Sequence, residues 1–414
     1  MKRNWLIFFA LFIVVCLSWN LSYAQEREKG ILDAISERIE FQGELEAGFQ
    51  VDSIGSGKVS GRRDRSRFDL ITAALAIEAQ VTDWINVTVV PLFEIEDFFI
   101  DEAHVTIGPT DRIPFYISGG IHYYPFGRRE AYTHFPDDPF VNLPITLYFG
   151  ELQDPGLILG FTHEIPGMTG HSFTVEGYVY KPWMYACGPY EDIKRTSHAD
   201  SFGFDVHYNV ETDDYTFEIG GSWTSNILAS SGIKDYASGL KEGIEGEPLL
   251  ALLNLPVEIY MDSKVDAIAA YMSGTYKNFY FTAEYMQSLE PLRHIYGQAE
   301  DVYFEEISPP DVDGHYAHPH LWTFEIGASI EEYLALPTPV ELMLRYAGSL
   351  EAQPIYDIPR NRWAVGLNIG IHDYATWSLA YAYNDYDPDW DEVYGEESGR
   401  SNRHLFFTQI AIEF

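Results

Sequence analysis

The chain ends in a segment whose side chains alternate in character, and its last residue is aromatic. In residues 406–414, the even positions form a mostly apolar face that ends at Phe414, and the odd positions carry Gln409 and Glu413. Water disfavours such an exposed apolar face, whereas lipid stabilises it. The segment therefore predicts a strand that closes a transmembrane β-barrel. We expect the barrel assembly machinery to recognise this strand.

The first residues have the pattern of an export signal. Basic residues at positions 2 and 3 precede an apolar run over 5–17, and Ser22-Tyr23-Ala24 forms a small-x-small cleavage site. We predict a signal peptide over 1–24, because the apolar run is short for an uncleaved anchor. Apolar residues at helical spacing then predict a short periplasmic helix over 25–40. Residues 41–414 are the predicted barrel domain.

Composition narrows the possible partners. The net charge of -37 argues against nucleic acid, because phosphate repels carboxylate, and against attachment to anionic lipid through a basic patch. After cleavage only Cys187 remains, so no internal disulfide can form. Later segments lack the ~18–20 apolar residues of a helical span. The exported product is therefore either soluble or a barrel.

Short and long connections alternate along residues 41–414. Turn-forming residues occupy the short ones, and longer ones fall near 52–65, 126–144, 183–200, 229–256, 290–318, 352–360 and 386–402. Short periplasmic turns and long outer loops are typical of outer-membrane barrels. The pattern predicts an all-β, antiparallel up-and-down barrel of about 16 strands.

Each predicted strand has one polar and one apolar face. A secreted β-sandwich would alternate in the same way, so the alternation leaves both folds open. Aromatic residues favour the barrel, because they gather at both ends of the strands, as Trp84 and Tyr374 do by short turns and Trp322 and Trp363 by long loops. We therefore expect the apolar faces to contact lipid and the polar faces to line a lumen.

A barrel of this size encloses water, so polar wall residues become candidate pore residues. Carboxylates dominate them, which favours cations, although a role as plain solvated residues remains open for each one. The lumen candidates are Glu78, Glu94, Glu102, His104, His122, Glu176, Asp205, His207, Glu218, Glu325 and Arg345.

Basic residues are scarce and occur in two clusters. Arginine pairs suit bidentate capture of carboxylates, so we predict a pore-mouth or ligand role, with a structural role against acidic loops as the alternative. The clustered residues are Arg62, Arg63, Arg65, Arg67, Arg128 and Arg129. The last two begin the 126–144 loop, which either folds into the lumen or caps the barrel outside.

Few residues indicate catalysis or metal binding. His315, His318 and His320 are weak candidates for a transition-metal site, because their spacing matches no strict motif. Motifs for nucleophilic, zinc-dependent or nucleotide-dependent catalysis are absent in a supporting context. We expect no cofactor and no enzymatic activity. A barrel-borne hydrolase or a surface adhesin remains the alternative to a channel.

One segment resembles a known family. The sequence ISGGIHYYPFG over 117–127 resembles the strand that leads into YPFG in siderophore porins of the legiobactin-uptake (LbtU) type, and residues 151–161 are similar to its continuation. The resemblance implies an outer-membrane porin for diffusion of small solutes, here iron-siderophores, without an energised plug domain. Its expected surroundings are outer-membrane lipid and lipopolysaccharide.

Overall fold

The structure is a computed structural model that describes thirteen segments of the chain. They are residues 38–56, 62–93, 98–108, 114–128, 144–182, 199–233, 257–261, 264–292, 295–299, 302–307, 317–353, 358–386 and 400–414. The expected signal peptide, and the expected helix up to residue 37, lie outside these segments. Strand β1 begins at Ile39, slightly before the boundary expected at residue 41.

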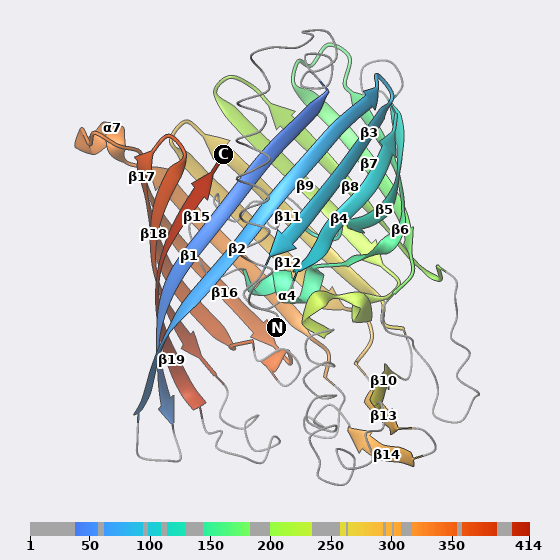
Figure 1. The fold of residues 1–414 in the computed structure, drawn as a ribbon, viewed down its shortest axis with the longest axis vertical. Coiled ribbons are helices and arrows are strands. Elements are labelled where there is room, and N and C mark those ends of the chain that lie inside the picture. The colour runs from blue at the N-terminus through green and yellow to red at the C-terminus, as the bar shows by residue number, and fades with distance from the viewer. Residues whose placement is uncertain are drawn as a thin grey trace, which may run out of the picture.

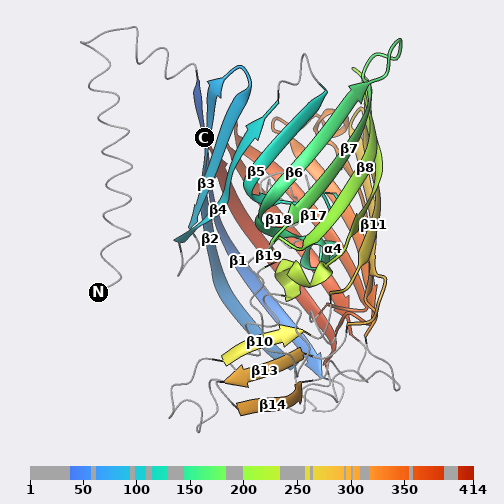
Figure 2. The same cartoon turned by 90° about the vertical axis from the view of Figure 1, so that its right-hand side faces the viewer.

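Sixteen of the described strands pair antiparallel and close into a barrel (Figures 1 and 2). The first eight are β1 (Ile39–Ser56), β2 (Arg62–Thr82), β3 (Ile85–Phe93), β4 (Phe98–Ile107), β5 (Phe115–Tyr123), β6 (Gln153–Glu164), β7 (His171–Tyr180) and β8 (Ser201–Glu211). The others are β9 (Tyr215–Thr224), β11 (Ala267–Tyr276), β12 (Phe279–Ser288), β15 (His320–Ser329), β16 (Val340–Leu350), β17 (Asn361–His372), β18 (Ala375–Asp385) and β19 (Arg400–Glu413). The predicted fold class and strand number are confirmed.

Three further strands form a small separate sheet. It consists of β10 (Val257–Met261), β13 (Ile295–Ala299) and β14 (Val302–Ile307), in the order β10-β13-β14. These strands belong to the connections β9–β11 and β12–β15, and Figure 1 shows them beyond one end of the barrel. The sequence pattern predicts a loop over 290–318, where β13 and β14 lie, and a loop over 229–256, which ends just before β10. The helix α7 (Glu331–Leu334) and the C-terminus lie at the opposite end, which we call the short-turn end.

The apolar face of the strands lies on the outer surface. In β19, Phe406, Ile410 and Ile412 are 41–46% exposed, whereas the inward Phe407 and Ala411 are at most 8% exposed. Trp84 and Tyr374 are also exposed at the short-turn end. This orientation is the one expected for a wall against lipid rather than for a sandwich core. Among the described residues, no helix is both long and apolar enough to cross a bilayer.

Strands β1 and β19, from opposite ends of the sequence, form the last pair of the barrel. Their register runs from Glu44 opposite Glu413 to Ser56 opposite Arg400. Inside the barrel, the Arg403 guanidinium donates two hydrogen bonds to Asp52, from Nε at 2.9 Å and from Nη2 at 2.7 Å. Such bidentate pairs join strands more firmly than single neutral hydrogen bonds do. We call the β1–β19 pairing, with this ion pair, the seam.

Asp52→Asn is expected to weaken the seam. The amide cannot match both guanidinium donors, and a hydrogen bond to a charged group contributes about 1.5–3 kcal/mol. The midpoint of chemical unfolding in detergent should therefore shift to lower denaturant concentration. Glu40→Gln is the matched control, because Glu40 lies on the same strand and is exposed. Equal midpoints for the two variants would contradict a stabilising role of the ion pair.

Candidate functional site

Both described ends of the connection between β5 and β6 turn into the barrel. We call its described parts, residues 124–128 and 144–152, the inner loop. The Gly127 N–H donates to Ser222 Oγ on β9 at 3.0 Å, and the Arg128 N–H donates to Glu284 Oε1 on β12 at 2.7 Å. Arg128 Nη1 also donates to Thr282 Oγ1 at 2.5 Å. The inner loop therefore reaches wall strands, β9 and β12, that are not neighbours of β5 or β6.

Glycine is required where the inner loop meets that wall. Gly127 has a φ of +76°, and a Cβ there would lie 2.2 Å from the Met286 methyl group. Tyr124 begins the turn, and its hydroxyl donates to the Asp154 carbonyl at 2.8 Å. Burial raises the pKa of Tyr124, so the hydroxyl remains a donor. The YPFG residues 124–127 thus direct the chain into the lumen.

A short helix completes the inner loop. Helix α4 (Ile145–Gly150) contacts β12 and β15, and both views show it within the barrel (Figures 1 and 2). Ile145 and Phe149 are fully buried, while Tyr148 is 37% exposed. Thr146 Oγ1 lies 3.4 Å from Thr323 Oγ1 on β15. Apolar burial and polar contacts therefore both hold α4 against the wall.

The inner loop belongs to a large apolar cluster. Residues of the wall strands β6, β7, β11, β12, β15 and β16 join it, and so do segments that follow β9, β12 and β16. Its members are Tyr124, Phe126, Ile145, Phe149, Leu152, Ile158, Tyr178, Tyr180, Ile227, Leu228, Ala229, Ile233, Val265, Ala267, Ala269, Met286, Leu292, Ala317, Leu321, Ala347, Ala352 and Ile358. The short helix η2 (Ile227–Ala229) is part of it. Side chains therefore fill part of the barrel interior.

A cavity of about 1290 Å³ lies between the inner loop and the short turn that follows β6. Its wall comes from that turn and from β8, β9, β11, β12, β15 and β16. The charged lining residues are Arg128, Glu164, Glu211, Glu218, Glu284, Glu325 and Arg345. Five carboxylates and two guanidinium groups give this space a negative balance.

Arginines occupy one part of the inner wall. Arg345 is buried on β16, and its Nε donates to Glu325 Oε1 on β15 at 2.8 Å. On β17, Arg362 Nε donates to Asn384 Oδ1 at 2.9 Å, and Asn384 is the cross-strand neighbour of Arg403. The three guanidinium groups thus follow one another from β16 to β19. The inner wall between β16 and β19 therefore carries three positively charged side chains.

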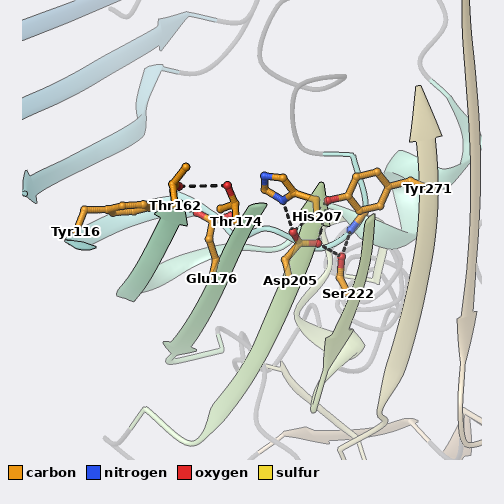
Figure 3. A network of polar contacts seen from close by, with 9 residues as sticks. Tyr116, Thr162, Thr174, Glu176, Asp205, His207, Ser222 and Tyr271 are labelled. Carbon is orange, nitrogen blue, oxygen red and sulfur yellow. Dashed lines mark hydrogen bonds and ion pairs between the residues drawn. The ribbon is translucent and has the colours of Figure 1, made fainter. Parts of the chain in front are cut away.

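The most connected acidic group lies on β7 and β8 (Figure 3). Glu176 and Asp205 are directly opposite each other in the register and are 7% and 1% exposed. Asp205 accepts hydrogen bonds from Ser222 Oγ at 2.6 Å and from the Tyr271 hydroxyl at 3.0 and 3.1 Å, and its Oδ2 lies 2.7 Å from His207 Nδ1. The Tyr116 hydroxyl donates to Glu176. We call Glu176, Asp205 and His207 the carboxylate–histidine cluster.

Two glycines position the tyrosines of this network. A Cβ on Gly160 would lie 2.1 Å from the Tyr116 ring, and one on Gly220 would lie 2.5 Å from the Tyr271 ring. The rings therefore lie flat over bare backbone, which brings each hydroxyl to a carboxylate. Tyr116 has the same parity as Ser118 and His122 on β5, so alternation alone could have placed it on the inner wall.

The structure brings together several residues predicted for the lumen. Buried inner-wall positions hold His122, Glu176, Asp205, Glu325 and Arg345, and Glu218 lines the cavity. His104 Nδ1 lies 3.6 Å from Glu102 Oε2, and the rings of His104 and His122 are 4.5 Å apart. Glu78 is exposed on β2. Glu94 lies outside the described residues.

The predicted arginine clusters are placed in part. Arg128 enters the lumen, and Arg129 lies outside the described residues. Arg62, Arg63, Arg65 and Arg67 belong to the first part of β2, at its long-loop end, where Arg65 is opposite Asp52 in the register. Their side chains are not described, so a pore-mouth role remains a prediction. Arg362 and Arg403 were not among the residues predicted from the sequence. Each nevertheless lies at alternate positions with other polar residues of its strand, which places it on the same face as those residues.

The predicted histidine group is divided. His318 Nε2 lies 2.5 Å from the Ser288 carbonyl oxygen, and His320 Nδ1 lies 2.8 Å from the Tyr285 hydroxyl. These contacts use one ring nitrogen of each histidine. His315 lies outside the described residues. Within the described segments, the three residues of the carboxylate–histidine cluster are potential metal ligands that do lie close together.

No family model matches this chain. It is 25% identical over 288 residues to a UPF0422 protein of Coxiella burnetii, covering 69% of this chain and 51% of that protein. A UPF0422 protein of Legionella pneumophila is 23% identical over 287 residues, covering 69% and 46%. The chain thus spans about half the length of the curated relatives it matches.

Solved structures share the fold. An anion-selective porin from Comamonas acidovorans has a TM-score of 0.51 at 9% identity, covering 91% of this chain and 99% of that porin. The outer membrane channel DcaP of Acinetobacter baumannii has a TM-score of 0.48 at 12% identity, covering 91% and 97%. The closed sixteen-strand barrel and the likeness to the Comamonas porin show that this protein has the closed barrel fold of outer-membrane porins.

Proposed function

We propose that the protein is an outer-membrane channel through which small solutes diffuse. The observation that carries the proposal is the inner loop, which is fastened across a closed barrel to β9, β12 and β15 and leaves a charged cavity beside it. A loop in this position narrows a lumen, and the charges beside it influence which solutes enter. The short-turn end then faces the periplasm, as in other outer-membrane barrels.

The charges of the cavity support a preference for cations. Its lining carries five glutamates and two arginines, and one arginine, Arg345, is paired with Glu325. A water-filled space with excess carboxylates lowers the energy of a cation relative to an anion. In planar bilayers with a salt gradient, we expect the reversal potential to have the sign of a cation-selective pore.

Glu218→Gln tests this preference directly. Glu218 lines the cavity on β9, so loss of its charge should reduce the ratio of cation to anion permeability. Glu413→Gln is the control, because Glu413 is exposed at the end of β19. A purified, folded barrel that never conducts would disprove the channel itself, and an unchanged permeability ratio in Glu218→Gln would disprove the role of the cavity.

A finer proposal concerns the solute, which we infer to be an iron-siderophore. It is supported by the resemblance of residues 117–127 to siderophore porins, because the same residues form β5 and the turn into the lumen. Deletion of the gene should slow growth under iron limitation when the cognate siderophore is supplied, and the wild-type gene should restore it. Equal growth with every siderophore tested would reject this solute while leaving the channel intact.

The alternative functions have less support in the described residues. A hydrolase needs a nucleophile beside a base, and His171 is the histidine next to Ser172 at the cavity. However, His171 Nδ1 lies 2.5 Å from the Tyr208 hydroxyl, so this nitrogen is already engaged. We therefore propose no catalytic role for this pair.

A further inference from the structure

We propose that the carboxylate–histidine cluster binds one divalent transition-metal ion on the inner wall of the barrel. Glu176, Asp205 and His207 each offer a ligand atom, and these atoms all lie within 4.8 Å of one another. Two carboxylates and one imidazole form a mixed oxygen and nitrogen set, which suits Zn²⁺ and similar first-row ions. The proposal does not depend on whether the barrel conducts.

The strand register explains why the three ligands meet. Glu176 on β7 and Asp205 on β8 are directly paired, so their side chains leave the sheet side by side. His207 is two residues beyond Asp205 and therefore points to the same face. Figure 3 shows the three side chains on the same side of these adjacent strands. The ligands thus come from a rigid part of the wall rather than from loops.

Little movement is needed to form the site. Ligand atoms around a tetrahedral zinc ion lie roughly 3.3 Å apart, given metal–ligand distances of about 2.0–2.1 Å. His207 Nδ1 and Asp205 Oδ2 are already 2.7 Å apart, so the ion would replace the proton they share. Since no pair in the cluster is separated by more than 4.8 Å, Glu176 has to approach by about 1.5 Å at most.

The electrostatics favour a cation at this point. Glu176 and Asp205 are nearly buried and directly opposite each other, so a cation placed between them would be attracted by both carboxylates. Ser222, Tyr116 and Tyr271 supply hydrogen bonds to them but no positive charge. These donors would hold the carboxylates in place around an ion, as outer hydrogen-bond partners do in metal sites.

An ion can reach the cluster from the cavity. The His207 side chain is 17% exposed, and Asn209, the next residue on the same face of β8, lines the cavity. Three protein ligands leave at least one coordination position for water. Because binding requires a neutral imidazole and ionised carboxylates, the affinity should fall as the pH is lowered.

Isothermal titration of the purified, full-length barrel in detergent micelles with Zn²⁺ tests the proposal. We expect His207→Gln and Asp205→Asn each to lower the affinity of this site for Zn²⁺ by at least ~100-fold. Each variant should therefore bind one Zn²⁺ ion per chain fewer than the wild type at the concentrations that saturate it. Tyr271→Phe keeps all three ligands and should weaken binding by ~10-fold to 100-fold, as expected when an outer partner is lost. His372→Gln is the matched control, because His372 lies at the far end of β17.

Titration with Co²⁺ provides a second measurement. An ion ligated by imidazole and carboxylates in a low-coordinate site should give visible absorption bands that His207→Gln abolishes and His372→Gln retains. Altered gel mobility on heating reports whether each variant still forms a barrel, so unfolded samples are recognised. The proposal is overturned if folded wild-type protein binds no Zn²⁺, or if folded His207→Gln binds as many ions as wild type.

Discussion

Phe149→Ala is expected to detach helix α4 from the barrel wall and to raise the single-channel conductance. The Phe149 side chain is fully buried in the apolar cluster, and a Phe→Ala change at such a position costs about 3–5 kcal/mol. This loss acts on the inner loop, whose attachment also includes the Gly127 and Arg128 amides. Hydrogen exchange of these two amides should accelerate by at least ~100-fold.

Tyr148→Ala is the control for this experiment. Tyr148 neighbours Phe149 on the same helix but is 37% exposed, so its removal creates no comparable cavity. Its amide exchange and conductance should stay close to those of the wild type. If Phe149→Ala leaves both measurements unchanged, the inner loop does not limit the lumen, and the channel proposal loses its main support.

Arg345→Met is expected to destabilise the barrel by about 3–5 kcal/mol, because it leaves the buried Glu325 without its guanidinium partner. Chemical unfolding in detergent measures this loss. The same change removes a positive charge from the cavity, so cation selectivity should increase in bilayers. The loss of stability and the increase in cation selectivity have the same cause, namely the negative charge of Glu325 without its guanidinium partner.

The double variant Glu325→Gln/Arg345→Met separates charge from packing. Replacement of both partners by neutral residues of similar size removes the unpaired charge, so most of the lost stability should return. Selectivity should also return toward the wild-type value. A double variant that is as unstable as Arg345→Met would show that packing of Arg345, and not its charge, stabilises this part of the wall.

Alternation and turn chemistry were sufficient to predict the barrel. The strand that ends at Phe414 pairs as expected, and its apolar face is exposed. The short connection at Thr82–Trp84 separates β2 from β3, as turn-forming residues indicated. These features are local, so a single sequence contains them.

The content of the lumen could not be predicted in the same way. Alternation predicts that Ala267 lies on the lipid-facing side of its strand, but the structure buries it in the apolar cluster beside the inner loop. Alternation also does not indicate that the inner loop covers Met286. The direction of that loop depends on contacts between segments far apart in the chain, such as Arg128 with Glu284. For the 126–144 loop, the alternatives of an inward fold and an outward cap had therefore remained open. Its described ends fold inward.

The carboxylate–histidine cluster shows the same limit. Glu176, Asp205 and His207 were each predicted for the lumen, yet as separate residues. Their proximity depends on the β7–β8 register, which places Glu176 opposite Asp205. The long connection between these strands, over 181–200, does not reveal that register from its sequence. A shift by one residue would have sent the partner side chain to lipid.

The seam also limits when this protein can become a barrel. The Asp52–Arg403 pair joins residues 351 positions apart, so β1 has no β19 to pair with until nearly the whole chain has been synthesised. Contacts so distant in sequence form slowly, and an unpaired strand edge invites association with other chains. Until β19 is available, the eighteen-residue β1 keeps one long unpaired edge along its whole length.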